Sequence, residues 1–408
     1  MSTNNTGTMK TIEKKNLVPF ILVTSLFLLW GIANNMTDTL LSAFKKIMSM
    51  TDTQTSFIQL AFYGSYFCFA LPAALYIRKY SYKSGVLLGL ALYAAGAILF
   101  FPAAKAASYA FYLVAIYILA GGCSILETTA NPYILAMGAP ETATRRLNVA
   151  QAFNPLGSIT GILLSKFFIL KDISLYSVSG TYMTLGFVLV IIMVVMCFVR
   201  MPEGGDGGEM SLKATFGRLF KNRKYIWGVV AQFFYVGAQI GVWSFTIRLV
   251  MKELGYVEAE GATIYLIAII GFSVARFLFT WLMKFVRPVK LLLWASVADI
   301  VCAALVVALG GTGWPCVIAL IAISFFMSLM FPTIYGIALE GVEDADRGGC
   351  PGDAKIGASG LIMAILGGAL VTPVQGMVSD AAGINLSYIV PLVCFVVVFG
   401  YSFSFRKN

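Results

Sequence analysis

Long apolar segments, separated by short polar ones, recur along the chain from residue 17 to its C-terminal end. A helix of about 20 apolar residues crosses the roughly 30 Å hydrocarbon layer of a bilayer. These segments are longer and more uniformly apolar than the roughly 10-residue alternating strands of an outer-membrane barrel. The pattern predicts an all-α membrane protein with twelve transmembrane helices, at about 17–44, 54–77, 83–102, 108–138, 143–170, 181–200, 224–253, 260–286, 288–309, 314–339, 355–380 and 384–405.

The only long polar connection lies in the middle of the chain, where residues 201–223 begin rich in glycine and acid and then turn basic. Such a composition is typical of a linker. A weak repeat relates the halves on either side, because Asn131–Ile134 (NPYI) lies near the end of span 4 and Phe331–Ile334 (FPTI) near the end of span 10. Two pseudo-symmetric six-helix halves are typical of the major facilitator fold. We therefore expect a tail at 1–16, one half at 17–200, the linker at 201–223 and the other half at 224–408.

Composition and charge support a membrane protein, since 59% of the residues are hydrophobic and only 12% are charged. The net charge of +10 would also suit a nucleic-acid-binding protein, but its placement argues otherwise. With both termini inside, 21 Lys and Arg fall on the inner side and six on the outer side. This asymmetry follows the positive-inside rule. We therefore expect a cytoplasmic tail, linker and C-terminus, with the lipid bilayer as partner and no nucleic acid.

Several kinds of chemistry have no support in the sequence. Histidine is absent, and the seven cysteines form no disulfide or metal-binding pattern. A Walker-type glycine loop is also absent. The first sixteen residues lack the apolar segment and cleavage site of a signal peptide. We expect no metal, no cofactor and no enzymatic activity, with span 1 serving as an uncleaved insertion signal.

A carboxylate, an amide and a proline stand inside the apolar run of span 4, at Glu127, Asn131 and Pro132. A charged side chain in hydrocarbon costs at least about 2.5 kcal/mol, so ionisable groups at this depth usually face a cavity or a partner. Glu127 is therefore either a structural acid paired with a cation such as Arg276, or a proton carrier. Burial favours the neutral form of a carboxyl, which lets it load and release a proton near neutral pH. Asn131 shares its helix face and would hold the acid or bind a substrate.

Span 1 contains a second acid, Asp38, in the polar stretch that holds Asn34, Asn35 and Thr37. Asp38 lies about twenty residues into the span, so one interpretation is an acid at the outer interface. The other is a polar site, because the stretch is too large for a lone capping residue. On a helix Asn34 and Asp38 share a face, and Asn35 lies beside it.

Four more amides and one aromatic residue suit a carbohydrate ligand. Gln151 and Asn154 lie three residues apart in span 5. Gln232 and Gln239 lie seven apart on one face of span 7, and Trp243 follows Gln239 by one turn. Amides around a polyol discriminate strongly, because a wrong substrate leaves them unpaired. Packing between helices is the alternative interpretation for both pairs.

Two further charges lie deep in predicted spans, Arg276 in span 8 and Asp299 in span 9. Arg276 paired with a carboxylate from either half would be a contact that switches between states or a structural ion pair. The roles of both residues stay open at this point.

Five segments spread over the chain have a specific likeness to one family. They are Trp30–Leu41 (WGIANNMTDTLL), Leu126–Pro132 (LETTANP), Arg146–Asn154 (RLNVAQAFN), Ala231–Gln239 (AQFFYVGAQ) and Gly368–Gly383. The chain resembles the fucose/galactose/glucose:proton symporter family of the major facilitator superfamily, and within it the bacterial L-fucose permeases. The resemblance covers essentially the whole chain.

By this resemblance, Asp38 and Glu127 are the acids required for proton-coupled sugar transport. The chain departs from the family at Asp299, which has no matching acid in the ninth helix. It also departs at Phe331, where the fucose permeases have tyrosine, so one possible sugar hydroxyl contact is missing and fucose is favoured less. The predicted substrate-binding residues are Asn34, Asn35, Asp38, Glu127, Asn131, Gln151, Asn154, Gln232, Gln239, Trp243, Arg276 and Phe331.

The resemblance implies uptake of a monosaccharide, L-fucose or a related hexose, together with a proton across the bacterial inner membrane. Transport by alternating access of two halves in a monomer is the expected mechanism. A glucose or galactose symporter is the first alternative. A drug–proton antiporter, a sugar sensor without transport and a membrane-embedded enzyme are further ones, which a sugar flux assay would separate.

Overall fold

The computed structural model describes residues 16–47, 52–169, 174–199, 211–344 and 349–406. In these ranges every element of regular secondary structure is helical. Eleven helical segments are long and apolar enough to cross a membrane, and a shorter apolar stretch, Leu17–Ala33, is part of the long helix α1. Each of the twelve predicted spans corresponds to one of these segments, which confirms the predicted all-α membrane fold.

The first half consists of the helices that precede the linker. They are α1 (Leu17–Ile47), α2 (Asp52–Lys79), α3 (Tyr82–Ala106), α4 (Tyr109–Ala136), α5 (Ala143–Gln151), α6 (Asn154–Leu164) and α7 (Leu175–Phe198). The fifth span is divided among α5, α6 and a π-helical turn, η3 (Ser165–Ile169). Helix α7 begins at Leu175 rather than at the predicted residue 181, because Ser174 caps it by accepting a hydrogen bond from Ser177 N at 3.1 Å.

The second half follows a short helix, α8 (Leu212–Lys221), which the sequence pattern did not reveal. Its elements are α9 (Arg223–Leu254), α10 (Glu258–Leu282), α11 (Pro288–Ala308), α12 (Trp314–Phe326), η4 (Met327–Leu329), α13 (Met330–Leu339), α14 (Asp353–Met363), η6 (Ala364–Leu366), α15 (Gly367–Ala382), η7 (Leu386–Tyr388) and α16 (Ile389–Ser404). The tenth span is therefore α12, η4 and α13, and the eleventh is α14, η6 and α15.

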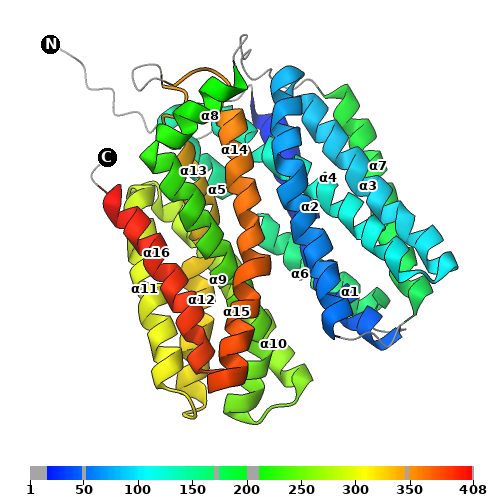
Figure 1. Cartoon of the computed structure of the whole chain (residues 1–408), viewed down its shortest axis with the longest axis vertical. Helices are drawn as coiled ribbons and strands as arrows, with labels where there is room; N and C mark the ends of the chain where they lie inside the picture. Colours follow the sequence, from blue (N-terminus) through cyan, green and yellow to red (C-terminus); the bar gives the residue numbers. More distant parts are fainter. Residues whose placement is uncertain (1–15, 48–51, 170–173, 200–210, 345–348, 407–408) are drawn as a thin grey trace.

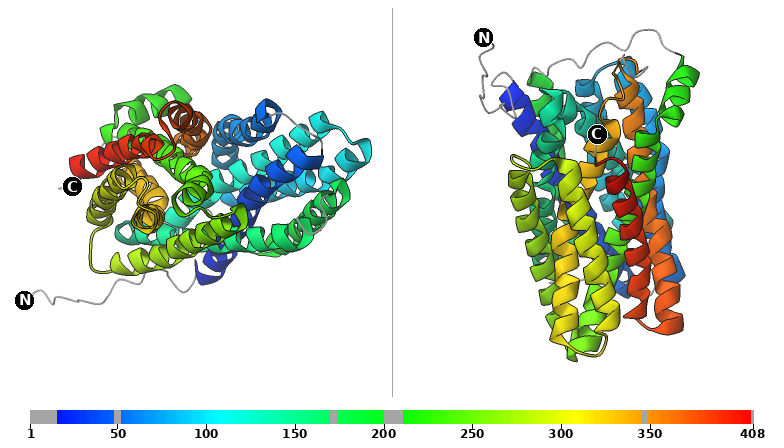
Figure 2. Two further views of the ribbon diagram at one scale, coloured as in Figure 1. Left: turned by 90° about the horizontal axis from the view of Figure 1, so that it is seen from below. Right: turned by 90° about the vertical axis from the view of Figure 1, so that its left-hand side faces the viewer.

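Figures 1 and 2 show two bundles side by side, α1–α7 in blue to green and α9–α16 in green to red. We call the end of the molecule at which α8 lies the α8 end, and the opposite end the far end. The halves contact each other at the α8 end through α2 with α14 and α5 with α13. Toward the far end, the ribbons of α2 and α15 separate (Figure 1). The two halves therefore pack against each other at the α8 end.

Polar and close contacts join the halves at the α8 end. Asn148 Nδ2 of α5 donates to Thr333 Oγ1 of α13 at 3.3 Å. The Lys355 ammonium of α14 lies 4.7 Å from the centre of the Tyr82 ring of α3. A Cβ atom on Gly336 would lie 2.6 Å from Thr144 Oγ1, so glycine allows α13 to approach α5. The absence of a side chain therefore sets how tightly this end closes.

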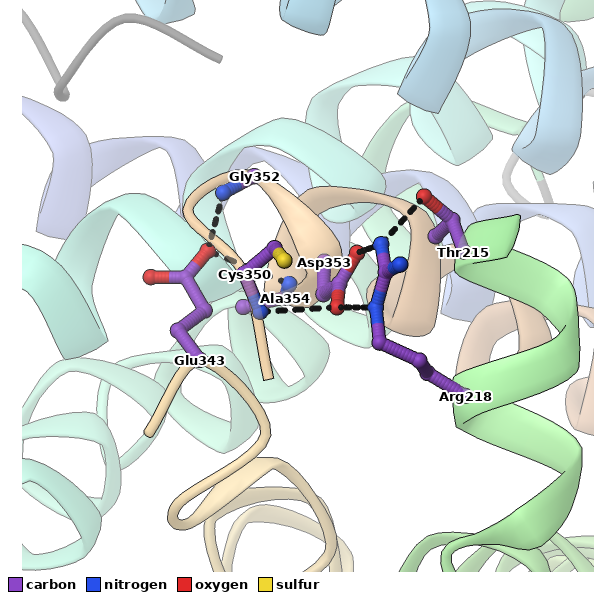
Figure 3. A network of polar contacts seen from close by, with 7 residues as sticks. All are labelled: Thr215, Arg218, Glu343, Cys350, Gly352, Asp353 and Ala354. Atoms are coloured by element: carbon purple, nitrogen blue, oxygen red, sulfur yellow. Dashed lines mark hydrogen bonds and ion pairs between the residues drawn. The ribbon is translucent and has the colours of Figure 1, made fainter. Parts of the chain in front are cut away.

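Hydrogen bonds of its side chains connect helix α8 to the start of α14 (Figure 3). Arg218 Nε and Nη2 donate to the two carboxylate oxygens of Asp353 at 2.7 and 2.8 Å. The same hydrogen bonds raise the pKa of Arg218, so its guanidinium stays charged at physiological pH. Glu343 accepts from Gly352 N at 2.8 Å and from Ala354 N at 3.2 Å, which stabilises the N-terminus of α14. The connection between the halves thereby has a fixed attachment to the second half.

Glycines bring α1 and α6 into close contact inside the first half. A Cβ atom on Gly157 would lie 1.9 Å from Leu28 O, and one on Gly31 would lie 2.1 Å from Asn154 O. Backbones approach this closely only where a side chain is absent. The crossing places Asn35 of α1 and Asn154 of α6 against the same space between the halves.

Candidate functional site

A cavity of about 130 Å³ lies between the two halves. Helices α1, α2, α5 and α6 form one wall, and α9, α10, α13 and η6 form the other. Seven predicted substrate-binding residues line it: Asn35, Gln151, Asn154, Gln239, Trp243, Arg276 and Phe331. The structure thus brings together side chains from five predicted spans that are far apart in sequence.

The wall from the first half carries amides that are anchored to the backbone. Asn35 Nδ2 donates to Gly31 O at 3.3 Å within α1. Asn154 Nδ2 donates to Phe27 O at 3.2 Å, which ties α6 to α1. These bonds orient both amides at the wall of the cavity, and an amide group offers both donors and an acceptor to a hydroxyl-rich ligand.

Aromatic residues form much of this wall, and the sequence reasoning did not select them. Trp30, Phe62, Tyr63 and Tyr66 all line the cavity. The Trp30 ring stacks on Tyr66 with centroids 6.4 Å apart, and Phe62 lies 5.4 Å from Tyr66. The spacing of 62, 63 and 66 on α2 places them on one helix face. That periodicity was the available signal, but in an apolar span it also fits ordinary packing.

The wall from the second half combines an aromatic ring with a buried cation. Trp243 packs edge-on against Phe272 at 5.1 Å between centroids. The Arg276 guanidinium lies 4.7 Å from the centre of the same Phe272 ring. The rings of Phe331 and Tyr235 lie next to each other, with their centroids 6.4 Å apart. The cavity therefore has a ring in each half and a positive charge in the second half.

Glu127 does not line the cavity; its side chain is 1% exposed. Neither carboxyl oxygen has a hydrogen-bond partner of good geometry among the described residues. The Asn131 side chain lies close enough to interact with the carboxyl, as the spacing on the helix predicted. Tyr66, which lines the cavity, is within electrostatic range of Glu127. The acid is thus placed behind the aromatic wall of the first half.

Asn131 is a partner of Gln151 rather than a wall residue. Gln151 Nε2 donates to Asn131 Oδ1 at 2.8 Å, and Asn131 is fully buried. Gln151 itself lines the cavity. A continuous set of polar contacts therefore leads from the cavity through Gln151 and Asn131 to Glu127.

Arg276 differs from the predicted ion pair. Its Nε donates to Ser328 O at 2.6 Å, and its Nη1 donates to Gln151 O at 3.1 Å. Among the described residues no carboxylate pairs with it, so Glu127 and Arg276 do not form the structural pair that was one interpretation of both. The cation binds backbone carbonyls of both halves because helix breaks present these oxygens beside it.

Gln232 and Asp299 lie away from the cavity. Gln232 is fully buried two turns nearer the α8 end than Gln239, and its amide has no partner among the described residues. Asp299 is also fully buried without a described partner, within electrostatic range of Tyr235 and Cys302. The predicted sharing of the site by both glutamines is therefore not seen in this structure.

Asn34 and Asp38 are part of α1, but their side chains lie outside the described residues. Their roles stay predictions.

In the described part of the chain, no group of three or more histidine, cysteine or acidic side chains is suited to a metal ion.

Comparison with known proteins identifies relatives over the whole length. Residues 20–350 match the model of the Major Facilitator Superfamily. The L-fucose-proton symporter of Haemophilus influenzae is 42% identical, over 98% of this chain and 99% of that protein. The L-fucose-proton symporter of Escherichia coli is 36% identical over 97% and 94%, and the glucose/galactose transporter of Brucella abortus is 31% identical over 100% and 98%.

Solved structures agree with the sequence relatives. The crystal structure of the transporter FucP in the outward conformation is similar, with a TM-score of 0.87 and 34% identity. The match covers 97% of this chain and 100% of the FucP chain. The proton:xylose symporter XylE shares the fold, with a TM-score of 0.77 at 11% identity.

Proposed function

Because the chain belongs to the Major Facilitator Superfamily, and within it to the family of L-fucose–proton symporters and glucose/galactose transporters, we propose that it takes up a monosaccharide together with a proton. L-Fucose or a related hexose is the proposed sugar. The observation that carries this proposal is the cavity between the halves, which is lined by amides, an arginine and aromatic rings. A buried carboxyl lies directly behind it.

The lining suits a small polyol. Asn35, Gln151, Asn154 and Gln239 offer acceptors and donors, and Arg276 offers further donors. Trp30 and Trp243 supply apolar ring faces on opposite walls. Sites that hydrogen-bond a substrate hydroxyl reject analogues lacking it, because buried polar groups are then left unpaired. This combination supports a sugar and gives little to a lipophilic drug.

Proton coupling follows from the cost of a buried charge. An ionised Glu127 without a partner in the membrane would be several kcal/mol unfavourable, so the carboxyl is neutral when the site is closed over it. Proton release then requires an open state or a polar partner. Asp38 is the second proposed acid, by resemblance. The halves move only when the acids are protonated or hold the sugar.

The orientation follows from the basic residues. We place the α8 end in the cytoplasm of a bacterium, with both termini inside and the bilayer around a single subunit. Because the halves meet at the α8 end, this structure corresponds to a carrier closed to the cytoplasm. An inside-negative potential of 100 mV supplies about 2.3 kcal/mol per charge, enough for roughly fiftyfold accumulation.

Liposomes containing the purified protein test the proposal. Labelled L-fucose, galactose, glucose and mannose compete for entry, and external pH is recorded during uptake. We expect sugar-dependent alkalinisation outside and preference for one hexose. Sugar entry without proton movement would reject the symport, and no flux of any sugar would reject transport.

Asp38 needs a separate test, since its side chain lies outside the described residues. Asp38→Asn should abolish active accumulation if the acid takes part in coupling. Unchanged accumulation would assign Asp38 to the outer interface instead.

Glucose or galactose is the second candidate. Phe331 presents a ring without a hydroxyl to the cavity, which favours a sugar that needs no hydrogen bond at this place. The same competition assay decides between the candidates.

A further inference from the structure

Arg276 connects the two halves through backbone carbonyls. Its Nη1 donates to Gln151 O at the end of α5, in the first half, and its Nε donates to Ser328 O in η4, in the second half. The side chain is 3% exposed. A buried cation is therefore held at the boundary between the halves by two carbonyl oxygens.

Prolines explain why both carbonyls accept from a side chain. In an α-helix the carbonyl of residue i accepts from the N–H of residue i+4. The residue four positions after Gln151 is Pro155, and the residue four positions after Ser328 is Pro332. Proline has no N–H, so neither carbonyl has its regular helical donor. The structure has a helix break at each place, between α5 and α6 and at η4.

Arginine suits this position because its planar guanidinium presents several N–H donors in fixed directions. One donor satisfies each freed carbonyl, and the same group lines the cavity, where further donors face the ligand space. The Gln151 side chain also donates to Asn131, which lies beside Glu127. Gln151 thus connects the acid of the first half to the cation of the second half.

We propose that Arg276, Gln151 O and Ser328 O form a bridge between the halves that stabilises the state closed at the α8 end, and that Pro155 and Pro332 make it possible by freeing its two acceptors. We call this the Arg276 bridge. Gln151 is nearer the α8 end of its span and Arg276 is six residues from the corresponding end of α10. Opening the molecule at the α8 end must separate them. The meaning of this opening for transport rests on the proposed function, but the bridge itself does not.

The variant Pro155→Ala tests the bridge. Alanine restores an N–H that competes with Arg276 for Gln151 O, so the state closed at the α8 end loses stability relative to the other state. Spin labels on Ala106→Cys and Thr312→Cys, in a background without native cysteines, report the separation of the far ends in liposomes without sugar. We expect the ratio of long to short distances to fall about tenfold, the value of one hydrogen bond to a charged group.

A double-mutant cycle separates the bridge from a general effect of proline on the helix. If Pro155 acts through Arg276, the substitution Pro155→Ala should have little further effect in the Arg276→Gln background. Pro288→Ala is the matched control, because Pro288 also stands in the first turn of a helix, α11, and neither carbonyl that accepts from Arg276 lies four residues before it. It should leave the distances unchanged.

Two results would overturn the proposal: no shift with Pro155→Ala in a folded protein, or an equal shift in the Arg276→Gln background. Pro332→Ala provides a second test if Pro155→Ala does not fold. It restores a donor for Ser328 O, and its shift should also vanish in the Arg276→Gln background. Because no sugar is present, these measurements stand even if the transported substrate is not a monosaccharide.

Discussion

The two walls of the cavity differ in the ionisable group that each half holds at or behind its wall. Behind the rings and amides of the first half is Glu127, a buried acid whose carboxyl oxygens have no hydrogen-bond partner of good geometry among the described residues. In the wall of the second half, Arg276 is a cation whose Nε and Nη1 donate to carbonyls of both halves. One half thus has a group that gains stability by binding a proton. The other has a group that gains stability by keeping the halves together.

This difference suggests a division of roles. We propose that proton handling belongs to the first half, while closure and part of the sugar contacts belong to the second. Gln151 lies where the roles meet, because its amide contacts Asn131 and its carbonyl accepts from Arg276. A carrier needs such a junction, since proton binding in one half must affect the movement of both.

The substitution Glu127→Gln is the strongest test of the proposed difference between the two halves. Glutamine imitates the protonated acid, so sugar exchange should persist while proton-driven accumulation falls from roughly fiftyfold to none. Counterflow and uptake driven by an imposed gradient in liposomes measure the two separately. The control is Asp299→Asn in the second half, an acid that does not line the cavity, and accumulation should survive it. Proton-driven sugar accumulation by the Glu127→Gln variant would contradict the proposed division of roles. Loss of this accumulation in the Asp299→Asn variant would contradict it as well.

The closed end is tested by Gly336→Ala. The added Cβ would lie 2.6 Å from Thr144 Oγ1, and such overpacking costs about 1–3 kcal/mol. The state closed at the α8 end should therefore lose population by about tenfold, measured with the same pair of spin labels. Thr144→Ala in the same chain removes the obstructing atoms and should restore the distances. A shift that persists in the double variant would place the effect elsewhere.

The rings of the two walls are compared by Trp30→Ala and Trp243→Ala. Each should weaken sugar binding about tenfold, because each removes one aromatic face from the ligand. Equilibrium binding of the preferred hexose measures the effect, and Trp227→Ala, at a ring that is 48% exposed outside the cavity, is the control. If only one substitution matters, the sugar is held by one half alone.

The smallest effect is expected for Phe331→Tyr. A hydroxyl at this place would add one neutral hydrogen bond, worth about 1 kcal/mol. The affinity for L-fucose should rise about fivefold relative to glucose, as measured by competition. Phe285→Tyr, at an exposed ring, should leave the preference as it is. A loss of L-fucose affinity would show that the ring itself is the required contact.

Much of the site was predictable because its residues are polar in an apolar background. Asn35, Gln151, Asn154, Gln239 and Arg276 stand out in their spans for this reason, and the structure places all five at the cavity. Aromatic wall residues such as Tyr66 were not predictable, because an aromatic residue in a membrane span is unremarkable. Helix α8 also escaped prediction, because its ten residues lie in a polar connection where no long apolar run marks a helix.

The sequence by itself determined the number of the spans and the approximate place of each in the chain. The reason is that a bilayer demands about twenty apolar residues per crossing, a property that is local and readable. Only the tertiary structure decided how deeply each polar side chain is buried and which groups it contacts. Gln232 and Gln239 share a helix face, yet one is sealed near the closed end and the other faces the cavity. Arg276 meets two carbonyls rather than a carboxylate, because helix breaks in different halves come together only in three dimensions.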